Sequence, residues 1–347
     1  MIDPKELNND RQLAYWLLFV CVAIFIMLVI GGATRLTHSG LSMMTWDPLL
    51  GWIPPLSEAA WLDSFKHYQQ IPEFHELNPD MDVEGYKGIF MLEYIHRVWG
   101  RLIGIFFLLP FLYFLFAGKI RRSLRPQLIT MFALGGLQGV LGWYMVSSGF
   151  DQAHVSQYRL TAHLMAAFTI FAYILWVATG LLYPKREPSL YSVKPLFWIV
   201  AGLTMLIAVT ISAGGFVAGL KAGFAYNTFP LMDGHFIPEG YGMLQPYYSN
   251  WFENIAAVQF NHRILAESVL LLVIAAFIYS RKFELVGPAK RGMHMMMGMV
   301  VIQFTLGVAT LLSVVQLHLA VAHQGGAMLL FAFALYTLRM LQTTEHK

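Results

Sequence analysis

The sequence predicts an all-α polytopic membrane protein, with eight transmembrane helices arranged as two parallel-repeat four-helix bundles related by pseudo-two-fold symmetry. Three observations support this fold class: an apolar composition, eight long apolar runs, and a set of motifs that occurs twice. Of the 347 residues, 57% are hydrophobic and 12% are charged, whereas a soluble domain has about 25% charged residues. The net charge of +3 is too small to indicate a nucleic-acid partner. We therefore expect the lipid bilayer to be the main surroundings of the chain.

Each apolar run is long enough to cross the hydrocarbon core as one helix, which takes about 20 residues. The expected spans are 13–33, 91–116, 127–147, 158–183, 195–216, 259–280, 293–313 and 317–340. The first run is too long for a signal-peptide core and no small-residue cleavage site follows it, so it is interpreted as a retained helix. The single cysteine, Cys21, lies within this run and is interpreted as a packing residue.

Positive charge is concentrated in the connections after the second, fourth and sixth expected helices. These connections carry Lys119, Arg121, Arg122 and Arg125, then Lys185, Arg186 and Lys194, then Arg281, Lys282, Lys290 and Arg291. Lys and Arg favour cytoplasmic loops, so both termini are expected on the cytoplasmic side. The long connections 34–90 and 217–258 are then expected on the outer side. The first is rich in acidic and aromatic residues, which suggests a segment at the membrane interface, as a lid or as a packed loop.

The motifs of the N-terminal half, 1–183, return in the same order in the C-terminal half, 184–347, at offsets of about 160 to 185 residues. The matched features are Gly31-Gly32 with Gly214-Gly215, Glu93-x-x-His96-Arg97 with Gln259-x-x-His262-Arg263, Gln138 and Gly142 with Gln303 and Gly307, and His163 with His323. Four helices is an even number, so both halves enter the membrane from one side and form parallel repeats. Close helix approach is expected at the small residues Gly135, Gly136, Gly139 and Gly142.

Four histidines indicate a haem protein. They are His96, His163, His262 and His323, each expected in the first two turns of an even-numbered helix, at similar depth near the outer face. In each half the two histidines belong to alternate helices, which face each other across a bundle core. A structural zinc site needs four protein ligands, whereas haem iron needs only axial ligands. A helix–helix hydrogen bond is the alternative role for one such histidine, and His318 is a competing ligand candidate on the last helix.

Charged residues beside these histidines suggest different tasks for the two halves. Arg97 and Arg263 are expected near the outer interface, where haem propionates would emerge, with snorkelling to lipid phosphate as the alternative. Glu93 lies one turn outward from His96 on the same helix face, and Gln259 takes the matching position in the other half. A carboxyl group at this depth is a functional candidate. We therefore expect proton handling in the first half and a prosthetic haem in the second, unless Glu93 is simply solvated.

Four segments resemble the haem A synthase family. They are 31–37 (GGATRLT), 39–42 (SGLS), 93–101 (EYIHRVWGR) and 158–163 (YRLTAH). The family oxidises the methyl group of haem O to the formyl group of haem A for terminal oxidase assembly, so the resemblance implies an oxidoreductase. It implies that His262 and His323 ligate the iron of a resident haem b. It also implies that His96 and His163 flank the substrate haem iron, and that Glu93 is essential for the oxidation.

The first outer loop contains no cysteine, so the chain resembles the cysteine-free branch of the family, found in Gram-negative bacteria and mitochondria. Thiol-based reduction through this loop is thereby excluded. The resemblance implies a bacterial inner (plasma) membrane location with haem sites toward the outer face. A haem O synthase, an electron donor and a homo-oligomer are possible partners. The alternative function is a di-haem b-type electron-transfer cytochrome without a substrate haem, and a transporter or a copper site at the methionines of 293–299 is less favoured.

Overall fold

The computed structural model of the chain describes residues 4–45, 51–152, 154–184, 188–189, 193–342 and 345–346. Among these residues, eight helices are long and apolar enough to cross a membrane. They are α1 (Pro4–Leu36), α4 (Val83–Phe116), α5 (Arg125–Ser147), α6 (Gln157–Leu182), α7 (Lys194–Gly219), α9 (Ile255–Ser280), α10 (Gly287–Leu312) and α11 (Leu317–Gln342). Each expected span falls on one of them, so the prediction of an all-α protein with eight membrane-spanning helices is confirmed. Lys185 and Arg186, which supported the orientation, lie outside the described residues.

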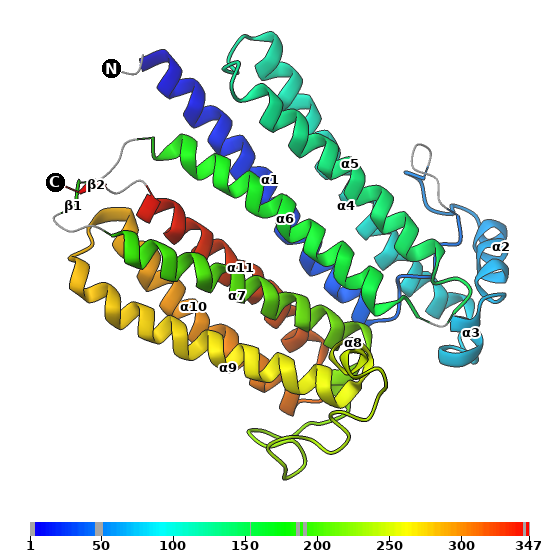
Figure 1. Ribbon diagram of the computed structural model, residues 1–347. Helices are drawn as coiled ribbons and strands as arrows, with labels where there is room; N and C mark the ends of the chain where they lie inside the picture. The colour runs from blue at the N-terminus through cyan, green and yellow to red at the C-terminus, as the bar shows by residue number, and fades with distance from the viewer. Residues whose placement is uncertain are drawn as a thin grey trace.

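Short elements occupy the connections between the long helices. They are α2 (Glu58–Tyr68), α3 (Pro72–Leu77), η1 (Ala222–Phe224), η2 (Tyr247–Ser249), α8 (Asn250–Glu253), η3 (Arg281–Phe283) and the parallel two-residue strands β1 (Pro188–Ser189) and β2 (Glu345–His346). Figure 1 shows the two chain termini at one end of the long helices and α2, α3 and α8 at the opposite end. An even number of crossings returns the chain to the side on which it started.

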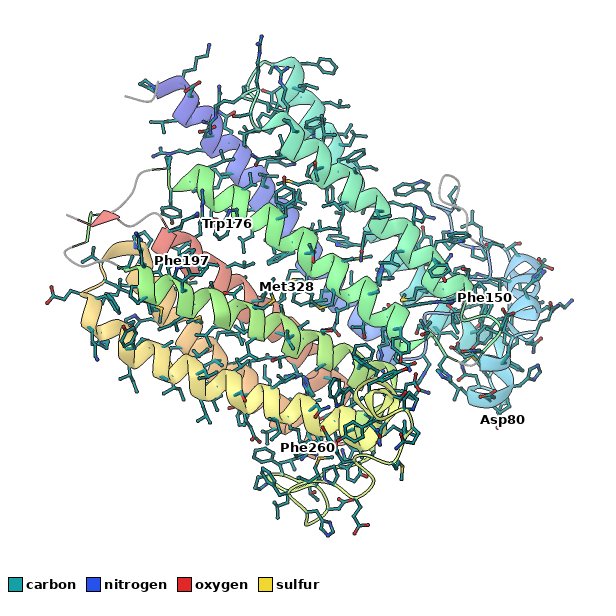
Figure 2. The ribbon with its side chains drawn as sticks, viewed as in Figure 1. Asp80, Phe150, Trp176, Phe197, Phe260 and Met328 are labelled. Carbon is teal, nitrogen blue, oxygen red and sulfur yellow. The ribbon has the colours of Figure 1, made fainter. Side chains whose placement is uncertain are left out.

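The long helices contact one another in two closed sets. In one set α1 contacts α4, α4 contacts α5, α5 contacts α6, and α6 contacts α1; in the other, α7, α9, α10 and α11 follow the same order. The sets meet through α6–α11, α1–α11 and α6–α7. One apolar core runs through both sets, and Phe168 and Phe331 join it across α6 and α11 with ring centroids 5.7 Å apart. Met328, which is fully buried, lies in the middle of the helices in Figure 2.

Helix α4 begins at Val83, about two turns before the expected start at residue 91. The Asp82 side chain caps it by accepting a hydrogen bond from the Gly85 amide at 2.8 Å. The added turns are kept helical because Tyr86 and Phe90 are buried against the outer loop. His96 therefore lies in the fourth turn of α4, and the expectation that it falls in the first two turns was wrong.

The first outer loop packs as a small core on this extended end of α4. Its buried members are Leu41, Met43, Phe65, Tyr68, Ile71, Phe74, Tyr86 and Phe90. Phe150, from the α5–α6 connection, packs against the cluster and is seen beside α2 in Figure 2. The aromatic residues that suggested an interfacial segment thus serve in part to fold this loop onto the end of the bundle.

The expectation of close helix packing at the α5 glycines was wrong for three of the four. A Cβ atom built on Gly135, Gly136 or Gly139 would meet nothing within 4 Å, so these glycines face open space. Gly142, the fourth, lies against His163. The four glycines follow one another at intervals of one to three residues, and this spacing does not reveal which of them meets another helix.

Candidate functional site

The structure brings the four histidines together as two pairs, one in each set of helices. His96 on α4 and His163 on α6 are close enough for their charges to interact, and so are His262 on α9 and His323 on α11. Because α4 and α6 alternate in the contact order of their set, as α9 and α11 do in theirs, each pair faces across a four-helix core. Helical bundles hold cofactors in this way.

The histidines of α4 and α9 pack against the first glycine of the two Gly-Gly motifs. A Cβ atom on Gly31 of α1 would lie 3.1 Å from Nε2 of His96, and one on Gly214 of α7 would lie 3.1 Å from Cε1 of His262. Carbon atoms rarely approach so closely, so a side chain here would push the imidazole away. These glycines make room for the rings.

The histidines of α6 and α11 are accommodated in the same way by α5 and α10. A Cβ atom on Gly142 would come within 3.0 Å of the His163 ring, and one on Gly307 within 2.8 Å of the His323 ring. Each of the four imidazoles therefore occupies a space that a methyl group would fill.

The second glycine of each Gly-Gly motif serves the contact between the two sets. A Cβ atom on Gly32 would lie 2.5 Å from Oε1 of Gln324 on α11, and one on Gly215 would lie 2.8 Å from Oγ1 of Thr161 on α6. The Gln324 amide also donates a hydrogen bond to the Leu28 carbonyl at 3.1 Å. The same dipeptide thus positions a histidine within one set and joins that set to the other.

Three of the histidine rings have hydrogen-bonding partners that the sequence did not identify. Nε2 of Gln138 donates to the backbone carbonyl of His163 at 2.9 Å and lies 3.2 Å from its Nδ1. Gln303 repeats this arrangement on His323, at 3.0 and 3.1 Å. Nδ1 of His262 faces the Thr210 carbonyl at 3.2 Å. The recurrence of glutamine and glycine four residues apart was visible in the sequence, but it did not reveal that both contact the same histidine.

Glu93 and Arg97 form a buried ion pair at the outer part of α4. Oε1 of Glu93 accepts a hydrogen bond from Nε of Arg97 at 3.0 Å and is also bonded to Nη2. Its other oxygen accepts from Oγ of Ser42 at 2.7 Å and from the Met43 amide at 2.8 Å. Arg97 in turn donates to the carbonyls of Met43 and Thr45. The pair therefore fastens the loop that follows α1, and Glu93, with 2% of its surface exposed, is not solvated.

Gln259 and Arg263 fasten the loop after α7 in the corresponding manner. Nε2 of Gln259 donates to the carbonyls of Ala222 and Tyr226 at 3.0 and 3.1 Å, and its oxygen accepts from Nη2 of Arg263 at 3.2 Å. Arg263 also donates to the carbonyls of Tyr226 and Thr228. The loop on Glu93 presents donors, whereas the loop on Gln259 presents acceptors, and this difference matches a carboxylate in one set and an amide in the other.

A second buried carboxyl group, Glu73 of α3, lies in the outer-loop core. It accepts a hydrogen bond from the Tyr68 hydroxyl at 3.1 Å, and that hydroxyl accepts one from Asn78 at 2.7 Å. Burial, the largest cause, and the charge of Glu93 together raise the pKa of Glu73 to about 7, against the opposing effects of the Tyr68 hydrogen bond and the Lys221 charge. The connection 34–90 contains eight acidic residues, and the sequence did not indicate that Glu73 is a buried one.

The competing candidates lie elsewhere. His318 is exposed at the start of α11, five residues before His323. Of the methionines at 293–299, Met293, Met296 and Met299 are buried members of the apolar core on α10. We expect packing rather than metal binding from them.

The two histidine pairs fit a haem by three features of the described residues. Each pair offers two imidazoles from helices that face each other across a core, and each ring lies 2.8 to 3.1 Å from the position that a Cβ atom would take on a glycine. In the second set Nε of Arg263 is buried and has no hydrogen-bonding partner among the described residues, so an N–H group remains for an acidic ligand such as a propionate.

Comparison with known proteins shows the family of the chain. A family model for cytochrome oxidase assembly proteins matches residues 14–335. A protein of Nitrosospira multiformis named Heme A synthase is 49% identical over 329 residues, which cover 94% of this chain and 92% of the relative. Proteins of the same name from Nitrosomonas eutropha and Granulibacter bethesdensis are 45% and 46% identical, each covering 98% of this chain and 96% and 90% of their own lengths. The chain belongs to the cytochrome oxidase assembly protein family of multi-pass membrane proteins.

Proposed function

We propose that this protein is an oxidoreductase that converts haem O to haem A, by oxidising a porphyrin methyl group to a formyl group for terminal oxidase assembly. The observation that carries the proposal is the presence of two facing histidine pairs, of which only one has a carboxylate, Glu93, one turn away. A di-haem electron-transfer protein would need both pairs but not this difference between them.

The two helix sets are proposed to be parallel repeats with separate tasks, residues 1–183 for the substrate and 184–347 for the resident haem. The matched contact orders and the matched histidine–glycine contacts support this division. We propose that both termini lie in the cytoplasm of a bacterial cell and that the histidines lie toward the outer face of the inner membrane. Figure 1 supports the shared side of the termini, and the basic connections support its assignment to the cytoplasm.

His262 and His323 are the residues that would hold a haem b, with Arg263 beside a propionate. When bound, this haem supplies one-electron transfer at the outer side of the membrane. The Thr210 carbonyl accepts a hydrogen bond from Nδ1 of His262, because a carbonyl can only accept. That leaves Nε2 of His262 as the ligating atom. In the first half, the guanidinium of Arg97 already pairs with Glu93, so its role toward a propionate is expected to be the weaker one.

His96 and His163 would hold the substrate haem O between α4 and α6, with its apolar tail among lipid and apolar side chains. Conversion of a methyl group to a formyl group takes up one oxygen atom, at the level of water, and releases four protons and four electrons, so an electron acceptor is required and the pocket has to accept protons. Glu93 is proposed to take part in this transfer, with the Ser42 hydroxyl, which donates to it at 2.7 Å, as its neighbouring proton carrier. Arg97 keeps the Glu93 carboxyl group oriented through its Nε and Nη2 contacts.

The proposal implies partners of stated chemistry. A haem O synthase would supply the substrate, and an electron donor or acceptor on the outer side would exchange electrons with the resident haem. A homo-oligomer is compatible with the exposed apolar helix faces.

Pigment extraction from the purified protein tests the proposal, with and without a supply of haem O. The unaltered protein is expected to yield haem b alone without that supply, and haem b with haem A when haem O is provided. His262→Ala should lose haem b, whereas His96→Ala should keep haem b and stop forming haem A. His318→Ala is the matched control, because this exposed histidine is on the same helix as His323.

Two results would contradict the proposal. Haem b alone under every condition would favour the electron-transfer cytochrome. Loss of haem b from His96→Ala together with its retention by His262→Ala would reverse the tasks of the two halves.

A further inference from the structure

Arg35 lies in the last turn of α1 and is half-buried. Among the residues that the structure describes, no hydrogen bond or ion pair engages its guanidinium. From its position we infer that Arg35 binds a propionate group of the substrate haem and thereby anchors the substrate in the first half. The inference rests on the proposed function, because it takes haem O to occupy the pocket between His96 and His163.

The first argument is that Arg35 lies one turn outward from the glycine that makes room for His96. Gly31 and Arg35 are four residues apart on α1, so they share a face of the helix, and a Cβ atom on Gly31 would lie 3.1 Å from Nε2 of His96. Leu28 and Gly32, on the same stripe of α1, are buried, so this stripe packs inside the protein rather than against lipid. Helical side chains lean toward the N-terminus of their helix, which for Arg35 is toward the turn that contains Gly31. Arg35 is therefore positioned at the outer side of the His96 pocket, where we expect the acid groups of a haem.

The second argument is that Arg97, which follows His96 in the sequence, is already engaged. Its Nε and Nη2 atoms bond to Glu93, and its two Nη atoms donate to carbonyls of the loop that follows α1. A propionate bound at Arg97 would have to compete with the Glu93 carboxyl group for these donors. Arg35 can offer its donors to a propionate without breaking such a contact.

The third argument is that the second half has no basic residue at the matching position. Ala218 follows Gly214 by four residues, as Arg35 follows Gly31. In the second half the buried guanidinium nitrogen without a partner among the described residues is Nε of Arg263, on α9. A role in helix packing that both repeats share would not need an arginine in one of them and an alanine in the other. The difference fits a contact to a ligand that the first half alone has to hold.

The fourth argument is that His38 and Lys221 add basic groups beside Arg35. His38 is close enough to Arg35 and to Lys221 for their charges to interact. Both His38 and Lys221 follow the first glycine of their Gly-Gly motif by seven residues and have left-handed backbone, with φ of 52° and 54°. The repeat thus brings two equivalent positions together where the halves meet. Glu73 is an acidic neighbour of Lys221, but the repulsion between Arg35 and these basic groups would be reduced by a carboxylate bound at Arg35.

The experiment compares the binding of ferric haem O with that of its dimethyl ester, in which both propionates are uncharged, to the full-length protein that retains haem b. Soret difference spectra give the two dissociation constants, and their ratio measures the preference for free propionates. Arg35→Met should weaken haem O binding about 10- to 100-fold, which is the contribution of a hydrogen bond to a charged group, and should leave binding of the ester unchanged. Arg35→Lys keeps the charge but not the planar fork, so it should retain part of the preference.

Lys221→Met is the matched control. It removes a neighbouring positive charge that is not on the face of α1 shared with Gly31, so the preference for free propionates should be unchanged. The haem b content and the melting temperature show whether each variant is folded. If Arg35→Met loses haem b, Arg35→Gln takes its place in the comparison.

The outcomes separate the inference from the proposed function. If Arg35→Met keeps the preference of the unaltered protein while His96→Ala changes the spectrum of bound haem O, the role of Arg35 is refuted and the substrate pocket stands. If His96→Ala binds haem O with an unchanged spectrum, or the unaltered protein binds neither form, the proposed pocket fails and the inference fails with it. Equal weakening of haem O and its ester by Arg35→Met would indicate damage to the pocket, and an equal loss of preference in Lys221→Met would indicate the general field of the basic groups. Either result would refute a direct contact between Arg35 and a propionate.

Discussion

Glu93 and Arg97 form a buried ion pair one turn apart on α4, with 3.0 Å between Oε1 of Glu93 and Nε of Arg97. In the other half, Gln259 and Arg263 make the corresponding contact at 3.2 Å without a negative charge. Hydrogen-bond donors surround the Glu93 carboxyl group, whereas backbone carbonyls face the Gln259 amide. The protein therefore has an acidic side chain beside one histidine pair and an amide beside the other.

Replacing Glu93 by Gln should abolish haem A formation and leave haem b in place. The amide cannot accept a proton in the way the carboxylate does, and its NH2 group would face donors, Ser42 or the Met43 amide. The haem A to haem O ratio in extracted pigment measures the effect. Gln259→Glu is the control, since a carboxylate there would face the carbonyls of Ala222 and Tyr226 and should not create a second oxidation site. Haem A at the unaltered level in Glu93→Gln would exclude Glu93 from the chemistry.

Removing the guanidinium should cost more stability in the first half than in the second. Arg97→Met leaves a buried carboxylate without its counter-ion, which costs about 3–5 kcal/mol. Arg263→Met leaves a neutral amide and two carbonyls with fewer partners, for which about 1–3 kcal/mol is expected. Thermal unfolding of the two variants in the same detergent gives the comparison. A larger loss of stability in Arg263→Met would show that the Glu93–Arg97 ion pair stabilises its loop less than the Gln259–Arg263 contacts stabilise theirs.

Alanine at the glycines that face the histidines should displace the rings. Gly307→Ala is expected to lose haem b, because its methyl group would lie 2.8 Å from the His323 ring. Gly31→Ala should keep haem b and lose haem A formation. Gly136→Ala is the matched control, since its methyl group would meet nothing within 4 Å and alanine favours the helix by up to about 1 kcal/mol. Extracted pigment and the melting temperature together distinguish a local effect from unfolding.

The outer-loop core should be more stable at acidic than at alkaline pH. The pKa of Glu73 is raised from 4.5 to about 7, first by burial. Its protonated form is therefore favoured in the folded state. The stabilisation is fully present below pH 4.5 and is lost as the pH rises through 7, by up to about 3 kcal/mol. The groups that face it are Tyr68, Glu93 and Lys221. Hydrogen exchange of α2 and α3 at several pH values measures the effect.

Glu73→Gln is the variant that checks this assignment. The amide keeps the shape of the protonated acid but cannot ionise. Between pH 5 and 8 the exchange rate of α2 and α3 in this variant should therefore rise little more than the rate of unprotected amides does. Glu84→Gln serves as the control, because Glu84 is exposed at the start of α4 and forms an ion pair with Lys87 on the same helix. A pH dependence that persists in Glu73→Gln would assign it to another group.

The sequence by itself determined the number and position of the spanning helices. Unpaired backbone N–H and C=O groups are too costly in lipid, so each long apolar run has to form an α-helix. It also singled out the four histidines, since polar residues at membrane depth are rare and their order repeats. The tertiary structure alone decided what these residues touch. The extra turns of α4 come from packing of Tyr86 and Phe90 on the outer loop, and the partners of Glu93 come from residues about 50 positions away. Gly142 lies against a histidine and Gly135 faces open space because of the way α5 is rotated against its neighbours. Such contacts between helices depend on distant parts of the chain, whereas apolar length can be recognised within one segment.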